Sequence, residues 1–167
     1  MLTRMADALI ANPNSALKTL LLSENNIRDV AGLANFLRTN STLEILDLSA
    51  NVIISEGVIA LAQALEQNNS LKEFQIQDAE IDMPAAEALA AMLRANHSLT
   101  FLDLGGEGIV SEALVPISAA LAANNTLKEL SIPAEEVQEE HVRIFANAIK
   151  TNLSLKILNI GELWDEL

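Results

Sequence analysis

The sequence has no cysteine and no tyrosine, and it is poor in aromatic and basic residues. Its 167 residues include four phenylalanines and one tryptophan, and 10 Lys and Arg stand against 23 Asp and Glu, a formal net charge of −13. The lack of cysteine excludes disulfides, thiolate metal sites and cysteine nucleophiles. The acidic excess argues against nucleic-acid binding, because neutralising phosphates requires an excess of Lys and Arg.

Long apolar segments and clustered metal ligands are missing as well. No apolar run approaches the roughly 18 residues of a membrane span, and the N-terminal stretch MLTRMADALIANPN is not that of a signal peptide. We expect His97 and His141 to be solvated, and the acidic run around Glu139 to favour a helix N-terminus rather than a metal. The sequence therefore predicts a cytoplasmic protein with no membrane contact, no metal and no cofactor.

A repeat of 28 residues runs through the chain. Asparagine recurs at this interval, at Asn12, Asn40, Asn68, Asn96, Asn124 and Asn152. Apolar residues stand three, seven and ten positions before each asparagine, the spacing of one helix face. After it follows Leu-x-x-Leu-x-Leu, whose last two apolar positions alternate as in a strand. Each unit is predicted to be a helix, a tight turn, a short strand and a loop, and stacking buries the leucines.

The segment from Leu43 to Ile53 reads L-x-x-L-x-L-x-x-N-x-I, with Asn51 as the asparagine, and resembles a leucine-rich repeat. The unit length resembles the ribonuclease-inhibitor class, and N-x-[ST]-L-x-x-L-x-L is similar to repeats of tropomodulins, NOD-like receptors and Ran GTPase-activating proteins. The resemblance implies one α/β domain over residues 1–167, a horseshoe-shaped solenoid of about six helix–strand repeats with a parallel sheet on its concave face. The chain departs from the pattern where the loop asparagine is replaced, at Ala79, Glu107, Glu135 and Leu163.

Five of the repeated asparagines form Asn-x-Ser/Thr sequons, beginning at Asn40, Asn68, Asn96, Asn124 and Asn152. Because they follow the repeat so strictly, we predict a structural role rather than glycosylation. Asparagine at a helix C-terminus tolerates the left-handed conformation, and Ser or Thr two residues later can bond to the turn. The glycines from Gly105 to Gly108 lack the Lys-Ser/Thr of a phosphate loop, so we interpret them as part of an inter-repeat loop.

The concave strand face is the candidate binding surface, because the residues between the leucine columns point out of it. Large apolar side chains there, including Leu21, are expected to be exposed, and exposed apolar patches mark binding surfaces. Carboxylates around them favour a basic partner, and lysines recur where the strands begin whereas acidic residues follow the strands. The predicted partner-binding residues are Ile45, Asp47, Glu73, Gln75, Phe101, Asp103, Glu129 and Ile157.

These patterns predict a non-catalytic module that binds a protein with a basic surface. Two alternatives remain open through the resemblance. One is a small-GTPase regulator or host-directed effector, for which Arg28 is the arginine nearest to the strand face; the other is binding to actin-filament ends. At the C-terminus, we expect Trp164 to fold over the last repeat as a cap. The alternatives are end-to-end self-association through this repeat or a sequence that is a piece of a longer repeat protein.

Overall fold

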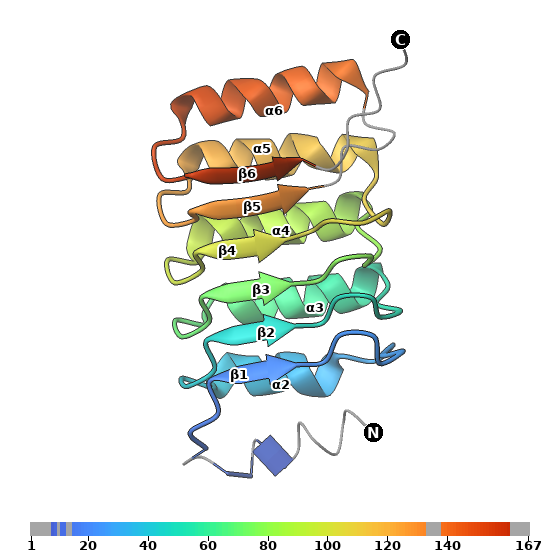
Figure 1. Cartoon of the computed structure of the whole chain (residues 1–167), viewed down its shortest axis with the longest axis vertical. Coiled ribbons are helices and arrows are strands. Elements are labelled where there is room, and N and C mark those ends of the chain that lie inside the picture. Colours follow the sequence, from blue (N-terminus) through green and yellow to red (C-terminus); the bar gives the residue numbers. More distant parts are fainter. Residues whose placement is uncertain (1–7, 10, 13–14, 133–137, 161–167) are drawn as a thin grey trace.

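The computed structural model describes residues 8–9, 11–12, 15–132 and 138–160. Within them, six short strands alternate with five helices (Figure 1). The strands are β1 (Thr19–Leu21), β2 (Ile45–Asp47), β3 (Glu73–Gln75), β4 (Phe101–Asp103), β5 (Glu129–Ile132) and β6 (Ile157–Ile160). The helices are α2 (Ala31–Thr39), α3 (Ser55–Leu65), α4 (Met83–Ala95), α5 (Leu114–Ala123) and α6 (Glu139–Thr151), with a 3-10 turn at Ser111–Ala113. The helix predicted before β1 lies largely outside the described residues.

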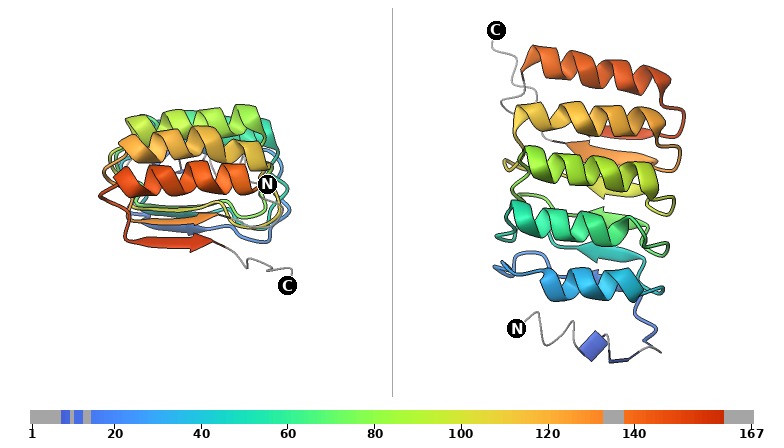
Figure 2. Two further views of the ribbon diagram at one scale, coloured as in Figure 1. Left: turned by 90° about the horizontal axis from the view of Figure 1, so that it is seen from above. Right: turned by 180° about the vertical axis from the view of Figure 1, so that it is seen from behind.

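The strands form one parallel sheet in chain order. The second residue of each strand pairs with the second residue of the next, from Leu20 in β1 and Leu46 in β2 to Leu158 in β6. All five helices lie on one side of this sheet and leave its other side open (Figure 2). Each parallel step crosses over through a helix, as parallel strands require. This is the α/β solenoid that the repeat predicted. No helix in the described part of the chain is long and apolar enough to cross a membrane.

The core is a set of columns that repeat from unit to unit between the sheet and the helices. The middle strand residues Leu46, Phe74, Leu102 and Leu130 are fully buried, as are the helix residues Leu33, Leu61, Leu89 and Ile117. A small residue stands six positions before the repeated asparagine and is also buried, at Ala34, Ala62, Ala90 and Ser118. Because each column is supplied by neighbouring repeats, no unit could bury these side chains alone.

The corner between each helix and the next strand differs from the prediction. Asn40, Asn96, Asn124 and Asn152 have φ between −81° and −75° and ψ between 129° and 135°, which is extended backbone. The predicted left-handed conformation is therefore wrong for these asparagines. Left-handed residues instead occupy the loops after the strands, with φ of 52° at Ala50, 63° at Asp78 and 89° at Gly106.

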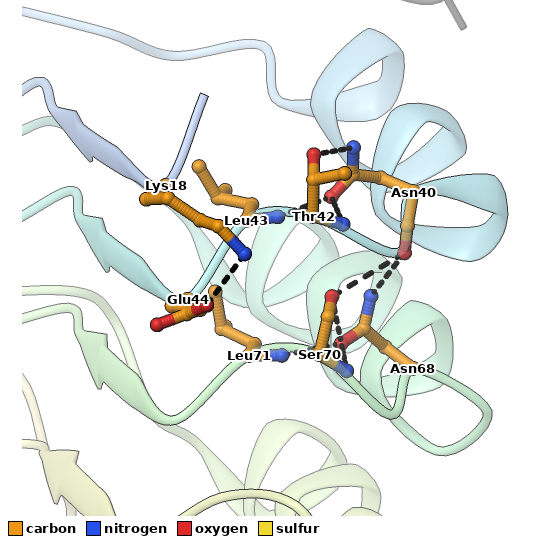
Figure 3. A network of polar contacts seen from close by, with 8 residues as sticks. All are labelled: Lys18, Asn40, Thr42, Leu43, Glu44, Asn68, Ser70 and Leu71. Carbon is orange, nitrogen blue, oxygen red and sulfur yellow. Dashed lines mark hydrogen bonds and ion pairs between the residues drawn. The ribbon is translucent and has the colours of Figure 1, made fainter. Parts of the chain in front are cut away.

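The side chains of Asn68, Asn96, Asn124 and Asn152 bond to the preceding repeat, as Figure 3 shows for Asn68. Asn68 Nδ2 donates to the main-chain oxygens of Leu37 (2.8 Å) and Asn40 (3.0 Å). Its Oδ1 accepts the N–H groups of Ser70 (3.0 Å) and Leu71 (2.9 Å), and Ser70 Oγ also contacts Asn40 O at 3.4 Å. The amide nitrogen that a glycan would require is thus engaged between repeats, consistent with a structural role.

Candidate functional site

The register of the sheet places the predicted binding residues in two rows on its open side, which we call the strand face. The first row consists of Thr19, Ile45, Glu73, Phe101, Glu129 and Ile157, and the second of Leu21, Asp47, Gln75, Asp103, Ser131 and Asn159. In β2 and β3 the middle residue is buried and its neighbours are partly accessible, so the rows face away from the helices. Strands about 4.8 Å apart make each row about 24 Å long.

Apolar and acidic side chains alternate along the first row, from Ile45 through Glu73, Phe101 and Glu129 to Ile157. Ile157 is 53 % exposed and Leu21, in the second row, is 63 % exposed. Ile45 and Phe101 are half-buried, so they are less accessible than we expected from the sequence. Both lie in interior strands with a neighbour on each side, whereas β1 and β6 are the outermost described strands. The apolar side chains of this row are therefore separated by acidic ones, and those of the interior strands are partly shielded.

The aspartates of the second row bond to their own loops. Asp47 Oδ1 accepts the N–H of Ser49 at 2.9 Å, and Asp103 Oδ1 accepts the N–H of Gly105 at 2.9 Å. Asp103 Oδ2 also accepts from the Gln77 side chain in the preceding repeat, and Asp103 is only 6 % exposed. The prediction that Asp103 is exposed on this surface is therefore wrong, because its carboxylate shapes the loop after β4.

Among the remaining polar residues of the rows, Ser131 is buried, whereas Glu73, Gln75 and Glu129 are half-buried. Among the described residues, neither Glu73 nor Glu129 forms an ion pair or a side-chain hydrogen bond. Two strand spacings, about 9.6 Å, separate these carboxylates, with Phe101 between them. The strand face thus carries one carboxylate on each side of a partly exposed aromatic ring, and neither carboxylate is in an ion pair among the described residues.

The edge where the strands begin carries exposed lysines, at Lys18, Lys72, Lys128 and Lys156. Glu44 interrupts this column, and its Oε1 accepts a hydrogen bond from Lys18 Nζ at 2.6 Å (Figure 3). The Lys18 ammonium lowers the pKa of Glu44 through this bond and its charge, and Lys72 adds a smaller effect. The lysine-rich edge predicted from sequence is therefore present but partly neutralised.

The opposite edge is acidic, with exposed side chains at Glu24, Asp78, Glu80 and Glu107. The further acidic residues predicted there, Glu135, Glu136 and Glu162, lie outside the described residues, as do Leu163 and Trp164. Arg28 is exposed in the loop between β1 and α2. Within the described ranges, no group of three or more His, Cys, Asp or Glu residues is placed to hold a metal ion.

Two further side-chain hydrogen bonds connect the starts of helices in successive repeats. His97 is exposed as expected, but His141 is half-buried with Nδ1 2.8 Å from Ser111 Oγ, which accepts the N–H of Gln138 at 2.9 Å. Asp82 caps α4 by accepting the N–H of Ala85 at 3.0 Å. The Ser55 hydroxyl bonds to the same carboxylate and lowers the pKa of Asp82. These residues join successive repeats, a role that sequence spacing alone did not reveal.

Comparison with known proteins agrees with this architecture. A family model described as "Leucine Rich repeat" matches residues 39–62, and comparison with curated protein sequences finds no significant match. Among solved structures, the actin-binding site 2 of leiomodin-1 superposes with a TM-score of 0.76 at 15 % identity, over 91 % of this chain and 90 % of that one. The tropomodulin C-terminal domain of Caenorhabditis elegans gives 0.67 at 15 % identity, over 88 % and 92 %. Together with the stacked helix–strand units, these matches show that the chain has the leucine-rich-repeat fold.

Proposed function

We propose that the chain is a non-catalytic protein-binding module whose binding site is the strand face. The observation that carries this proposal is the first row, where Glu73 and Glu129 are free of ion pairs among the described residues and flank the partly exposed Phe101. A partner would gain apolar contact at Phe101 and charge complementarity on either side of it. Buried aromatic anchors within a polar rim are the usual arrangement of binding hot spots.

The partner that suits this surface is a basic helix, loop or small domain. The chain carries a net charge of −13, and the acidic edge borders the strand face. Such a field speeds encounter with a basic protein more than it raises affinity. A row about 24 Å long is long enough for one helix or one loop. We place this interaction in the cytoplasm, without nucleic acid or membrane.

A pull-down comparison tests the assignment directly. The bait is either the wild-type chain or the variant Glu73→Lys/Phe101→Ala/Glu129→Lys, after circular dichroism has established that both fold. A variant with the same charge change on the helices, Glu56→Lys/Glu87→Lys, is the matched control, since both residues are exposed on α3 and α4. We expect partners that the wild type and the control retain but the strand-face variant loses. Identical partners for all three would contradict the proposal.

Actin binding is a second candidate function, favoured by the likeness to the actin-binding site of leiomodin-1. At 15 % identity that likeness concerns the fold, so the test must be functional. Elongation of pyrene-labelled actin from filament ends is measured with wild-type chain and with the strand-face triple variant. Slower elongation with the wild type alone would support this function at this surface. Unchanged elongation with the wild type would remove it.

A further inference from the structure

The last described repeat leaves uncovered the positions that earlier repeats bury. We call these residues the C-terminal end face: Val142, Ala146, Ile149, Leu155, Leu158 and Ile160. Val142 is 41 % exposed, Ile160 is 38 % exposed and Ala146 is also exposed, while the other three are half-buried. The equivalent residues one repeat earlier are each 3 % exposed or less: Leu114, Ser118, Leu121, Leu127, Leu130 and Ile132. The same columns are thus core in one repeat and surface in the next.

Among the described residues, the main chain at this end also has sheet-edge groups with no strand paired to them. In each earlier repeat, the carbonyl oxygen just before the strand accepts two N–H groups from the following repeat. Lys128 O, for example, accepts from Lys156 N at 2.7 Å and Ile157 N at 3.0 Å. Lys156 O holds this position in the last repeat, where the described chain has no strand after β6. The end face therefore combines apolar side chains with an open strand edge, which tends to pair with another chain.

The charges of α6 indicate what fits there. Glu139, Val142, Ala146 and Lys150 follow one another at spacings of three and four residues, so they lie on one stripe of the helix. The exposure of Val142 and Ala146, buried at equivalent positions in earlier repeats, identifies this stripe as the one facing away from α5. The stripe begins with an exposed carboxylate and ends with an exposed ammonium. A second copy of α6 in the antiparallel direction would bring Glu139 of each chain opposite Lys150 of the other.

We propose that the chain forms a two-fold symmetric homodimer through the C-terminal end face, with the α6 helices antiparallel. The arrangement is self-complementary, as a two-fold interface must be. It places each helix N-terminus beside the other's C-terminus, which the helix dipoles favour. Ala146, near the middle of the stripe, allows the helices to approach closely. A head-to-tail arrangement would set the C-terminal end face of one chain against β1 of the next. Leu20, the core residue of β1, is already buried, so it cannot cover the exposed apolar residues of that face.

Charge exchange gives a test that depends on this geometry. Glu139→Lys sets two ammonium groups against each other in both halves of the dimer, and Lys150→Glu sets two carboxylates together. We expect each single variant to raise the dissociation constant about tenfold, from two symmetry-related pairs. In an equimolar mixture, the mixed dimer of the two single variants pairs opposite charges at both contacts, because one chain then carries an ammonium group at both positions and the other a carboxylate at both. The mixture should therefore associate more tightly than either single variant alone. The double variant Glu139→Lys/Lys150→Glu also restores opposite charges at both contacts, so it should associate nearly as well as the wild type. Sedimentation equilibrium of the full chain measures these constants.

The control is Arg94→Glu, which makes the same charge change at the helix position equivalent to Lys150, on α4 in the middle of the stack. It should leave the dissociation constant unchanged. A wild-type chain that stays monomeric at about 1 mM would overturn the proposal. If Trp164→Ala then also lowered the unfolding temperature, Trp164 would be the occupant of the end face instead. Single variants that weaken association but are not rescued in the double variant would overturn the antiparallel two-fold arrangement.

Discussion

The side-chain amide of Asn96 donates to the main-chain oxygen of Asn68, one repeat earlier, at 2.9 Å. Asn152 makes the same bond to Asn124 at 2.9 Å, and Asn68 makes it to Asn40 at 3.0 Å. This series links successive corners between helix and strand. On the loop side, by contrast, the interrepeat role falls to Asn51, whose Oδ1 accepts from Asn25 N and Ile27 N. The hydrogen bonds between corners are also present in the later repeats, in which alanine or glutamate replaces the loop asparagine.

Replacing one corner asparagine should therefore weaken the whole stack. Asn68→Ala would leave the oxygens of Leu37 and Asn40 and the N–H groups of Ser70 and Leu71 without their partner. Buried groups left unsatisfied are costly, so we expect a loss of about 2–4 kcal/mol in the free energy of unfolding. Urea denaturation followed by circular dichroism measures this loss.

The adjacent asparagine provides the control for this experiment. Asn69 is exposed, and its amide bonds only to Gln67 O, at 3.1 Å, among the described residues. Asn69→Ala should change the free energy of unfolding by less than about 0.5 kcal/mol. Equal losses from Asn68→Ala and Asn69→Ala would contradict the corner interpretation.

The glycine loop after β4 allows a second stability prediction. A Cβ on Gly108 would lie 1.9 Å from the main-chain oxygen of Ala79, so this glycine permits two loops to touch. Ile81 N donates to Gly108 O at 2.7 Å across the same contact. Gly108→Ala must push the loops apart, and we expect a loss of about 2 kcal/mol or more. Thermal unfolding monitored by circular dichroism would reveal it.

Gly105 is the matched control in the same loop. A Cβ there would meet nothing closer than Asp103 Oδ1, at 3.1 Å. Gly105→Ala should therefore lower the unfolding temperature much less than Gly108→Ala. If both substitutions are tolerated equally, the close loop contact is not a source of stability.

The repeat, the strands and most of the core could be predicted because they depend on spacing within one unit. The leucine columns from Leu43 and Leu46 onward lie where the period places them, since periodic apolar residues have only one way to face a shared core. The backbone at Asn96 could not be predicted this way. Its side chain bonds to the main-chain oxygens of Leu65 and Asn68 in the previous repeat. Spacing within one repeat does not reveal these contacts.

The strand face was predicted less well than the fold for the same reason. The register of the strands determines which residues share a row. How accessible each residue is depends on its neighbours in other repeats. Asp103 is buried because Gln77 bonds to it from the preceding unit. His141 bonds to Ser111 across a similar interval. Spacing within one unit contains no signal for such pairs; comparing polar residues between adjacent repeats could have suggested them.

The pair formed by Lys18 and Glu44 gives a pH-dependent prediction. Lys18 holds the pKa of Glu44 below its ordinary value, mainly by its hydrogen bond. A lowered folded-state pKa stabilises the fold at pH values above the pKa of the unfolded chain, and this contribution is lost as the pH falls through the folded-state pKa. Both side chains are about half exposed, so the effect on stability is small. Carboxyl NMR titration should place Glu44 below the usual value of about 4.3.

Two lysine variants separate the causes of this shift. Lys18→Met should raise the pKa of Glu44 toward its ordinary value, whereas Lys72→Met should raise it less, because Lys72 acts only through its charge. A larger rise with Lys72→Met would mean that the hydrogen bond from Lys18 does not dominate in solution.

Binding of a basic partner to the strand face should depend on salt through two carboxylates. Raising the ionic strength from about 0.1 M to about 1 M shortens the screening length from about 10 Å to about 3 Å. Glu73→Gln/Glu129→Gln removes the charges but keeps the side-chain shape, so it should lower the association rate and flatten its salt dependence. Phe101→Ala should mainly speed dissociation, because it removes apolar contact. Surface plasmon resonance at several salt concentrations, with the partner recovered by pull-down, measures both rates.

Glu56→Gln/Glu87→Gln is the control for these rates, since it removes the same number of charges from the exposed sides of α3 and α4. Its association rate should fall only slightly, because the two groups lie on helices that cover the other side of the sheet (Figure 2). If the helix control and the strand-face variant lose the same salt dependence, the attraction comes from the overall charge of −13. Selection of a basic partner would then not reside in Glu73 and Glu129, and the strand face would contribute through Phe101 and its apolar neighbours alone.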